Sequence, residues 1–267
     1  MYLRPATLTE ALSARAEHPG ALVLAGATAA TPALATGGRP PAALLDLAGV
    51  RDVAALDEAA GRIRLGPLVT AERLAAQPTL GPDRLPLRGF ATPAVRARAT
   101  ALGNLFQRPH DLAAPLAALA GEVEVAHADG ARRTVDVPAL VTVPGRLAEA
   151  AELAVALTVA VPHRFAYARV AVRPAAAPTL AAVAVALLDD GPRVYIVTVT
   201  APVPARRAAA ERLLLDAGAG EEFAAAAAAG LPADAPAGQA DPAYLATAVR
   251  ALARRCHRRC HGRPDHD

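Results

Sequence analysis

Short apolar runs alternate with short amphipathic segments over the first third of the chain, and the apolar runs predict buried strands. These runs cover 21–25, 42–47 and 62–65. Residues 7–10 form a capping-box pattern that predicts a helix through about Glu17, and Thr70 begins a helix that reaches about Ala76. Strands that alternate with short helices indicate an α/β unit, whose connections are too short for a large doubly wound sheet.

The next stretch mixes helices with a hairpin. Pro93 is an early residue of a helix predicted to run to about Ala101, and the segment 102–104 is expected to break it. Asp111 can cap a further helix over 112–120. The runs 122–127 and 131–137 alternate like strands on either side of an Asp-Gly turn. This part of the chain is therefore predicted to be α+β.

The pattern changes near 161–164, where we place a domain boundary. Three strand-like runs follow, 165–173, 179–188 and 193–200. Helical segments come after them, at about 205–216, 221–229 and 242–259. Consecutive strands followed by consecutive helices predict a separate α+β domain.

Composition and charge narrow the class of protein. The chain has 267 residues, enough for one large domain or two modest ones, and all 28 of its basic residues are arginine. The net charge is +3, but residues 250–267 carry six Arg and two Asp, so the remainder is about −1. That balance argues against a nucleic-acid partner. We find no signal peptide and no apolar run of membrane-spanning length, and the two cysteines suit the cytoplasm.

Two loops of small residues are candidates for binding chemistry. The segment 26–29 follows a buried strand, and such a loop can bring its backbone N–H groups close to a phosphate; it can equally be an ordinary strand-to-helix turn. The second loop, 102–104, is followed by Asp111. This carboxylate can accept a hydrogen bond from a ribose hydroxyl or cap the next helix, and the spacing alone favours the cap.

Other motifs carry little chemistry. The chain lacks a Rossmann fingerprint, a Walker motif, a nucleophile elbow and a His-Glu-x-x-His pattern. In the basic C-terminal tail, Cys256 and Cys260 would share one face of a helix, as would His257 and His261. A zinc site needs that spacing, but the nearby arginines oppose a dication, and we expect a solvated chain end without metal.

Six segments, in order along nearly the whole chain, resemble the FAD-binding subunit of the molybdenum hydroxylases, as in carbon monoxide dehydrogenase and xanthine dehydrogenase. The first three are similar to the family's Ala-Gly-Gly-Thr-Asp, Ile-Gly-Ala-x-Val-Thr and Ala-Thr-Leu-Gly-Gly-Asn signatures, the last with a Pro and an Asp after it. They lie at 25–29, 65–74 and 99–105, with Pro109 and Asp111. The other three resemble a strand before an Arg-rich turn, a Val-Ala-Pro-x-Pro-x-Arg segment and the last helix. They lie at 167–173, 199–206 and 241–255.

The resemblance implies an α+β architecture. Two subdomains of a PCMH-type FAD-binding fold, about 1–55 and 56–163, would make one domain over 1–163. A domain with a three-stranded antiparallel sheet and a helical bundle would occupy 164–260, and a tail 261–267.

The resemblance also implies FAD as cofactor. The two loops would hold its pyrophosphate through backbone N–H groups, and an aspartate would bind the ribose side. Carried over, this implicates Ala25, Gly26, Ala27, Thr28, Thr100, Gly103, Asn104 and Asp111. The chain departs from the family pattern at Ala27 and Leu102, where glycines are expected, and at Ala29, where the family has an acidic residue. Asp111 is two residues closer to the asparagine than in the family.

The functional prediction is an FAD-dependent oxidoreductase component that takes electrons from an iron–sulfur partner, supplied by a molybdenum subunit, and passes them to NAD⁺ or a quinone. No general acid or base is predicted, because an electron relay needs none. Two alternatives stay open at this point: a scaffold with the same fold and a decayed FAD site, and a standalone flavin oxidase.

Overall fold

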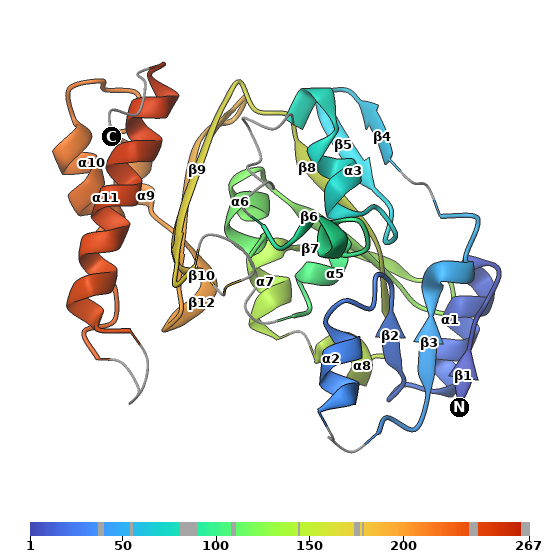
Figure 1. The fold of residues 1–267 in the computed structure, drawn as a ribbon. Coiled ribbons are helices and arrows are strands. Elements are labelled where there is room, and N and C mark those ends of the chain that lie inside the picture. The colour runs from blue at the N-terminus through green and yellow to red at the C-terminus, as the bar shows by residue number, and fades with distance from the viewer. Residues whose placement is uncertain are drawn as a thin grey trace.

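Three β-sheets, each with its own helices, follow one another through the molecule (Figure 1). The computed structural model describes residues 1–36, 40–53, 56–80, 90–107, 111–143, 145–173, 177, 179–234 and 240–262. Pro109, part of the third family-like segment, lies outside these residues.

The N-terminal sheet has three parallel strands in the order β1-β3-β2. Its elements are β1 (Tyr2–Leu3), α1 (Leu8–Glu17), β2 (Leu22–Leu24), α2 (Ala30–Ala35), β3 (Leu44–Asp46) and the 3₁₀ turn η1 (Leu47–Gly49). The Thr7 side chain accepts a hydrogen bond from the Glu10 N–H at 3.2 Å, so α1 begins where the capping pattern predicts. Ala11 and Leu45, both fully buried, belong to the core of this unit.

The central sheet has five antiparallel strands in the order β4-β5-β8-β6-β7. They are β4 (Leu56–Ala59), β5 (Arg62–Leu65), β6 (Glu122–Ala126), β7 (Arg132–Asp136) and β8 (Leu153–Ala160). Its helices are α3 (Ala71–Ala75), η2 (Pro78–Leu80), α4 (Pro93–Arg96), α5 (Ala101–Asn104), α6 (Ala113–Ala118), α7 (Val137–Thr142) and α8 (Arg146–Glu149). Leu153 and Val155 of β8 also join the N-terminal core, so this strand links the two units.

The C-terminal sheet is antiparallel, in the order β12-β11-β10-β9. Its strands are β9 (Arg164–Ala171), β10 (Thr179–Leu188), β11 (Gly191–Thr198) and β12 (Ala201–Arg206), followed by α9 (Ala208–Glu211), α10 (Gly220–Ala228) and α11 (Pro242–Cys260). Alternate residues of β10 enter different cores: Ala184 faces the core that contains α6, whereas Val183 faces the core with α10 and α11. The sheet therefore lies between two helical layers (Figure 1), which explains why β10 is almost continuously apolar.

The predicted α+β fold class is confirmed, with local corrections. The C-terminal sheet has a fourth strand, β12, which contains Pro202 and Pro204; proline is tolerated there because β12 is an edge strand. The predicted helix from residue 205 is shorter, because Ala205 pairs with β11. The predicted helix from Pro93 ends at Arg96.

The segment 102–104 does not break a helix but lies inside one. The Thr100 hydroxyl accepts a hydrogen bond from the Gly103 N–H at 3.0 Å and so starts α5.

Candidate functional site

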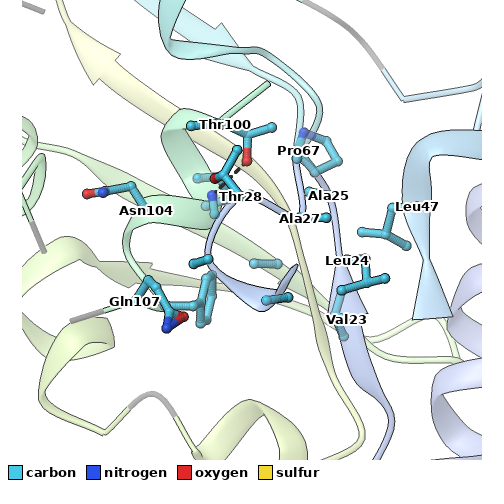
Figure 2. A pocket seen from close by; sticks show the side chains of 18 of the residues that line it. Val23, Leu24, Ala25, Ala27, Thr28, Leu47, Pro67, Thr100, Asn104 and Gln107 are labelled. Carbon is cyan, nitrogen blue, oxygen red and sulfur yellow. Dashed lines mark hydrogen bonds between the residues drawn. The ribbon is translucent and has the colours of Figure 1, made fainter. Parts of the chain in front are cut away.

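A cavity of about 800 Å³ lies where β2, its following loop, α5 and β8 meet (Figure 2). All eight residues singled out from the sequence line this cavity. They are Ala25, Gly26, Ala27, Thr28, Thr100, Gly103, Asn104 and Asp111. Segments more than 70 residues apart in the chain are thus brought to one site, and its volume is that of a ligand pocket.

The first loop, 25–29, is shaped by its contact with the second segment, by which we mean residues 98–104, from Arg98 to the end of α5. A side chain at Gly26 would place its Cβ 1.9 Å from the Arg98 carbonyl oxygen, so only glycine allows the two segments to approach this closely. Ala27 has a φ of +57°, a left-handed conformation that favours glycine.

The loop also carries free hydrogen-bond donors. None of the backbone N–H groups of residues 26–30 donates to another residue in the part of the chain that the structure describes. Helix α2, which follows the loop, has no side-chain cap at its start. Adjacent N–H groups without an acceptor form a concave donor surface of the kind that binds anions.

The second segment is fixed by hydrogen bonds on both sides. Ala101 N–H donates to the Val69 carbonyl at 3.1 Å, and the Asn104 Oδ1 accepts from the Leu112 N–H at 2.9 Å. The Asn104 amide group keeps its donors, which have no acceptor among the described residues. Leu102 is 3% exposed and packs in the hydrophobic core of the central unit, and it also belongs to the wall of the cavity.

Asp111 does not cap helix α6, contrary to the preference from its spacing. The N-cap position is Leu112, and no side chain caps it. The Asp111 Oδ1 instead accepts a hydrogen bond from the Thr179 hydroxyl, and the Arg169 Nη1 lies 3.8 Å away. Both partners come from the C-terminal sheet, which the local sequence around Asp111 could not reveal. The carboxylate therefore joins the cavity to that sheet.

Arg15 and Glu152 also line the cavity, and sequence analysis missed both. The Arg15 side chain is 4% exposed and donates from Nη1 to the Ala21 carbonyl at 2.9 Å and from Nε to the Glu152 carbonyl at 3.3 Å. Burial lowers the pKa of the Arg15 guanidinium. An arginine in an amphipathic helix is normally a surface residue, so the sequence held no signal for this position.

The cysteine–histidine tail is part of the core, which corrects the expected solvated chain end. Cys256 is fully buried and Cys260 is 6% exposed, in the core between α11 and the C-terminal sheet. The His257 Nε2 contacts the Asp216 carbonyl at 3.0 Å, and the His261 Nε2 contacts the Leu214 carbonyl at 2.8 Å.

Within the described ranges, no three His, Cys, Asp or Glu side chains gather as metal ligands would. No helix in the same part of the chain has both the length and the apolar character that crossing a bilayer requires.

The α+β units, the two close-packed loops and the donor-lined cavity define a class of proteins that hold a phosphate-containing cofactor between small-residue loops. Residues 1–164 match the family described as the FAD binding domain in molybdopterin dehydrogenase, and the chain belongs to that family. The family match confirms FAD, the cofactor expected from the sequence.

The chain is also similar to known proteins in sequence and in structure. The chain is 30% identical over 142 residues to the nicotine 6-hydroxylase medium subunit of Paenarthrobacter nicotinovorans; the match covers 51% of this chain and 50% of the relative, so it spans about half of that protein. Quinoline 2-oxidoreductase from Pseudomonas putida 86 superposes with a TM-score of 0.82 at 21% identity, covering 98% of this chain and 96% of the other. A carbon monoxide dehydrogenase from Hydrogenophaga pseudoflava superposes with a TM-score of 0.83 at 22% identity, covering 99% and 98%. These structural likenesses establish the fold.

The residues of this chain fit the cofactor of the family. The substitution at Ala27 keeps the backbone conformation that glycine would adopt, with the neighbouring N–H groups still free. Leu102 is accommodated by the hydrophobic core. The departures from the family pattern at Ala27 and Leu102 therefore leave the N–H donors of the first loop without competing partners among the described residues.

Proposed function

We propose that this chain is the flavoprotein subunit of a molybdenum hydroxylase-like dehydrogenase and relays electrons through FAD. The observation that carries the proposal is the cavity, with its row of free N–H donors, in a member of this FAD-binding family. Bound FAD supplies the redox chemistry, because it accepts and releases electrons one or two at a time. The protein binds the cofactor, orients it and separates it from water.

We assign the pyrophosphate to the N–H groups of the first loop and to the start of α5. Residues Ala25, Gly26, Ala27 and Thr28 form the first half of this cradle, and Thr100, Gly103 and Asn104 form the second. The support from the first loop is that its backbone N–H groups have no acceptors among the described residues and that Gly26 lets the two segments touch. At the start of α5 the Gly103 and Asn104 N–H groups already donate to Thr100, so that half of the cradle offers the Asn104 side-chain amide and the Thr100 hydroxyl. Charge-assisted hydrogen bonds from such donors to phosphate are strong.

Asp111 is proposed to hold a ribose or ribityl hydroxyl. Its Oδ1 is occupied by Thr179, whereas Oδ2 takes no hydrogen bond from a described residue. Arg169 and Thr179 keep the carboxylate in one position, so one oxygen remains available as an acceptor at the cavity wall.

The domain organisation and the partner subunits complete the proposal. We propose one FAD-binding unit over 1–163 and a C-terminal unit over 164–260, with iron–sulfur and molybdenum subunits as electron donors. The nicotine 6-hydroxylase relative, whose name marks it as a medium subunit, supports a multisubunit enzyme. The buried cysteines Cys256 and Cys260, which form no disulfide among the described residues, suit the reducing cytoplasm.

Co-expression with iron–sulfur and molybdenum subunits of the same enzyme family tests the relay. We expect the three chains to elute as one complex, and the flavin absorption near 450 nm to bleach on addition of substrate only in that complex. Flavin bleached by substrate in the isolated chain would refute the relay and favour a standalone oxidase. An FAD-loaded chain that never associates with the other subunits would also contradict the proposal.

A further inference from the structure

A buried cation without a carboxylate partner forms one end of the cavity. Arg15 of α1 uses two of its five N–H donors on the carbonyls of Ala21 and Glu152. The neighbouring Glu152 carboxylate is not available, because Arg133 binds it from Nε at 2.8 Å and from Nη2 at 2.5 Å. Among the described residues that line the cavity, Arg15 is the one cationic side chain.

Arg15 lies too far from the first loop to share its phosphate. Its anchor, Ala21, precedes Gly26 by five residues, and the three extended residues of β2 between them span roughly 10 Å, which is well beyond hydrogen-bond reach. FAD consists of two ring systems on either side of the pyrophosphate. With the pyrophosphate at the loop, Arg15 faces one of the two rings.

The surroundings of Arg15 decide which ring that is. Its two anchors adjoin enclosed parts of the cavity wall, because Ala21 is 7% exposed and Leu153, next to Glu152, is 3% exposed. Figure 2 shows Asn104 and Gln107 on the opposite side of the first loop from Leu24 of β2, and Gln107 is exposed. The flavin ring must reach another redox centre, so it suits the exposed side, and the redox-inert adenine suits the enclosed end.

We propose that Arg15 binds the adenine ring of FAD at the enclosed end of the cavity and makes the site selective for adenine nucleotides. Adenine offers ring nitrogens that only accept hydrogen bonds, whereas a guanidinium only donates them and can also stack on a ring face. The proposal rests on the proposed FAD site, and it adds the residue that distinguishes FAD from FMN.

Isothermal titration of the full chain, freed of flavin, with FAD, ADP and FMN tests this. Arg15→Met removes the donors at similar volume, and Arg15→Lys keeps the charge without the fork. Arg207→Met is the matched control, because Arg207 is also a partly buried arginine bound to a backbone carbonyl, that of Ala227, but lies outside the cavity lining.

We expect Arg15→Met to weaken FAD and ADP at least tenfold and FMN less than twofold, with Arg15→Lys in between and Arg207→Met unchanged. The absorption spectrum of the bound flavin should not move. Equal weakening of FMN, or a shifted flavin spectrum, would place Arg15 at the flavin instead. Unchanged FAD and ADP affinities in Arg15→Met would overturn the inference alone, whereas a folded wild-type chain that binds no FAD would overturn the proposed function.

Discussion

Ala27→Gly is the substitution that most directly tests the geometry of the first loop. Ala27 has a φ of +57°. This conformation costs an L-residue with a Cβ about 1–2 kcal/mol, which glycine avoids. Glycine loses more backbone entropy on folding, about 0.5–1 kcal/mol. The difference predicts that Ala27→Gly stabilises the protein by about 0.5–1 kcal/mol, or about 1–4 °C in Tm for a chain of this size.

The same substitution should strengthen FAD binding. Without a Cβ the loop can approach a phosphate more closely, and one improved hydrogen bond to a charged group, of about 1 kcal/mol, corresponds to about fivefold in Kd. Thermal unfolding followed by circular dichroism gives the stability, and fluorescence quenching of FAD gives the affinity.

Ala60→Gly is the matched control. Ala60 is exposed, has a φ of +49° and is not among the cavity-lining residues. It should give a similar rise in Tm with no change in FAD affinity. A lower Tm in Ala27→Gly, or an equal change of FAD affinity in both variants, would contradict a left-handed Ala27 at the phosphate site.

Three further predictions follow from single contacts. Thr100→Val removes the cap of α5 and should cost about 1 kcal/mol in urea unfolding and weaken FAD binding, whereas Thr70→Val, at the cap of α3, should lower stability alone; equal FAD affinities in both would contradict the assignment. Asp111→Asn removes the charge that faces Arg169 in a largely buried pair and should cost about 1–3 kcal/mol, so unchanged urea unfolding would argue against that pair. Burial raises the pKa of the Cys260 thiol from 9.0 to about 12, so native protein should resist thiol reagents at pH 8. The pKa of this thiol is higher in the folded than in the unfolded protein, so the buried neutral thiol adds its full contribution to the free energy of unfolding below pH 9. That contribution is lost as the pH rises toward 12, because the thiol ionises in the unfolded chain first. Wild type should therefore lose more stability than Cys260→Ala over that range.

Local signals predicted the elements that depend on them. The capping pattern of α1 and the apolar runs of β2, β5 and β10 matched the structure because each is determined by neighbouring residues. Strand β8 escaped prediction, since its alanine-rich run reads as helix or strand and is decided by pairing with β5 and β6. Strand β12 was missed because its prolines are compatible only with an edge position.

The site, too, has residues that local sequence motifs identified and residues that only tertiary packing reveals. The order of short motifs identified the two loops that line the cavity, although most of their individual residues are weak signals. Arg15 could not be found, because its burial depends on the Glu152 carbonyl, 137 residues away. The partner of Asp111, Thr179, is 68 residues away, and only tertiary packing brings the two together.

The most direct test of the central claim is an FAD titration of the purified wild-type chain, followed by absorption spectroscopy of the protein after removal of free flavin. We expect one FAD per chain, with flavin bands that remain with the protein and are released on unfolding. A correctly folded chain that takes up no FAD and shows no flavin bands would contradict it.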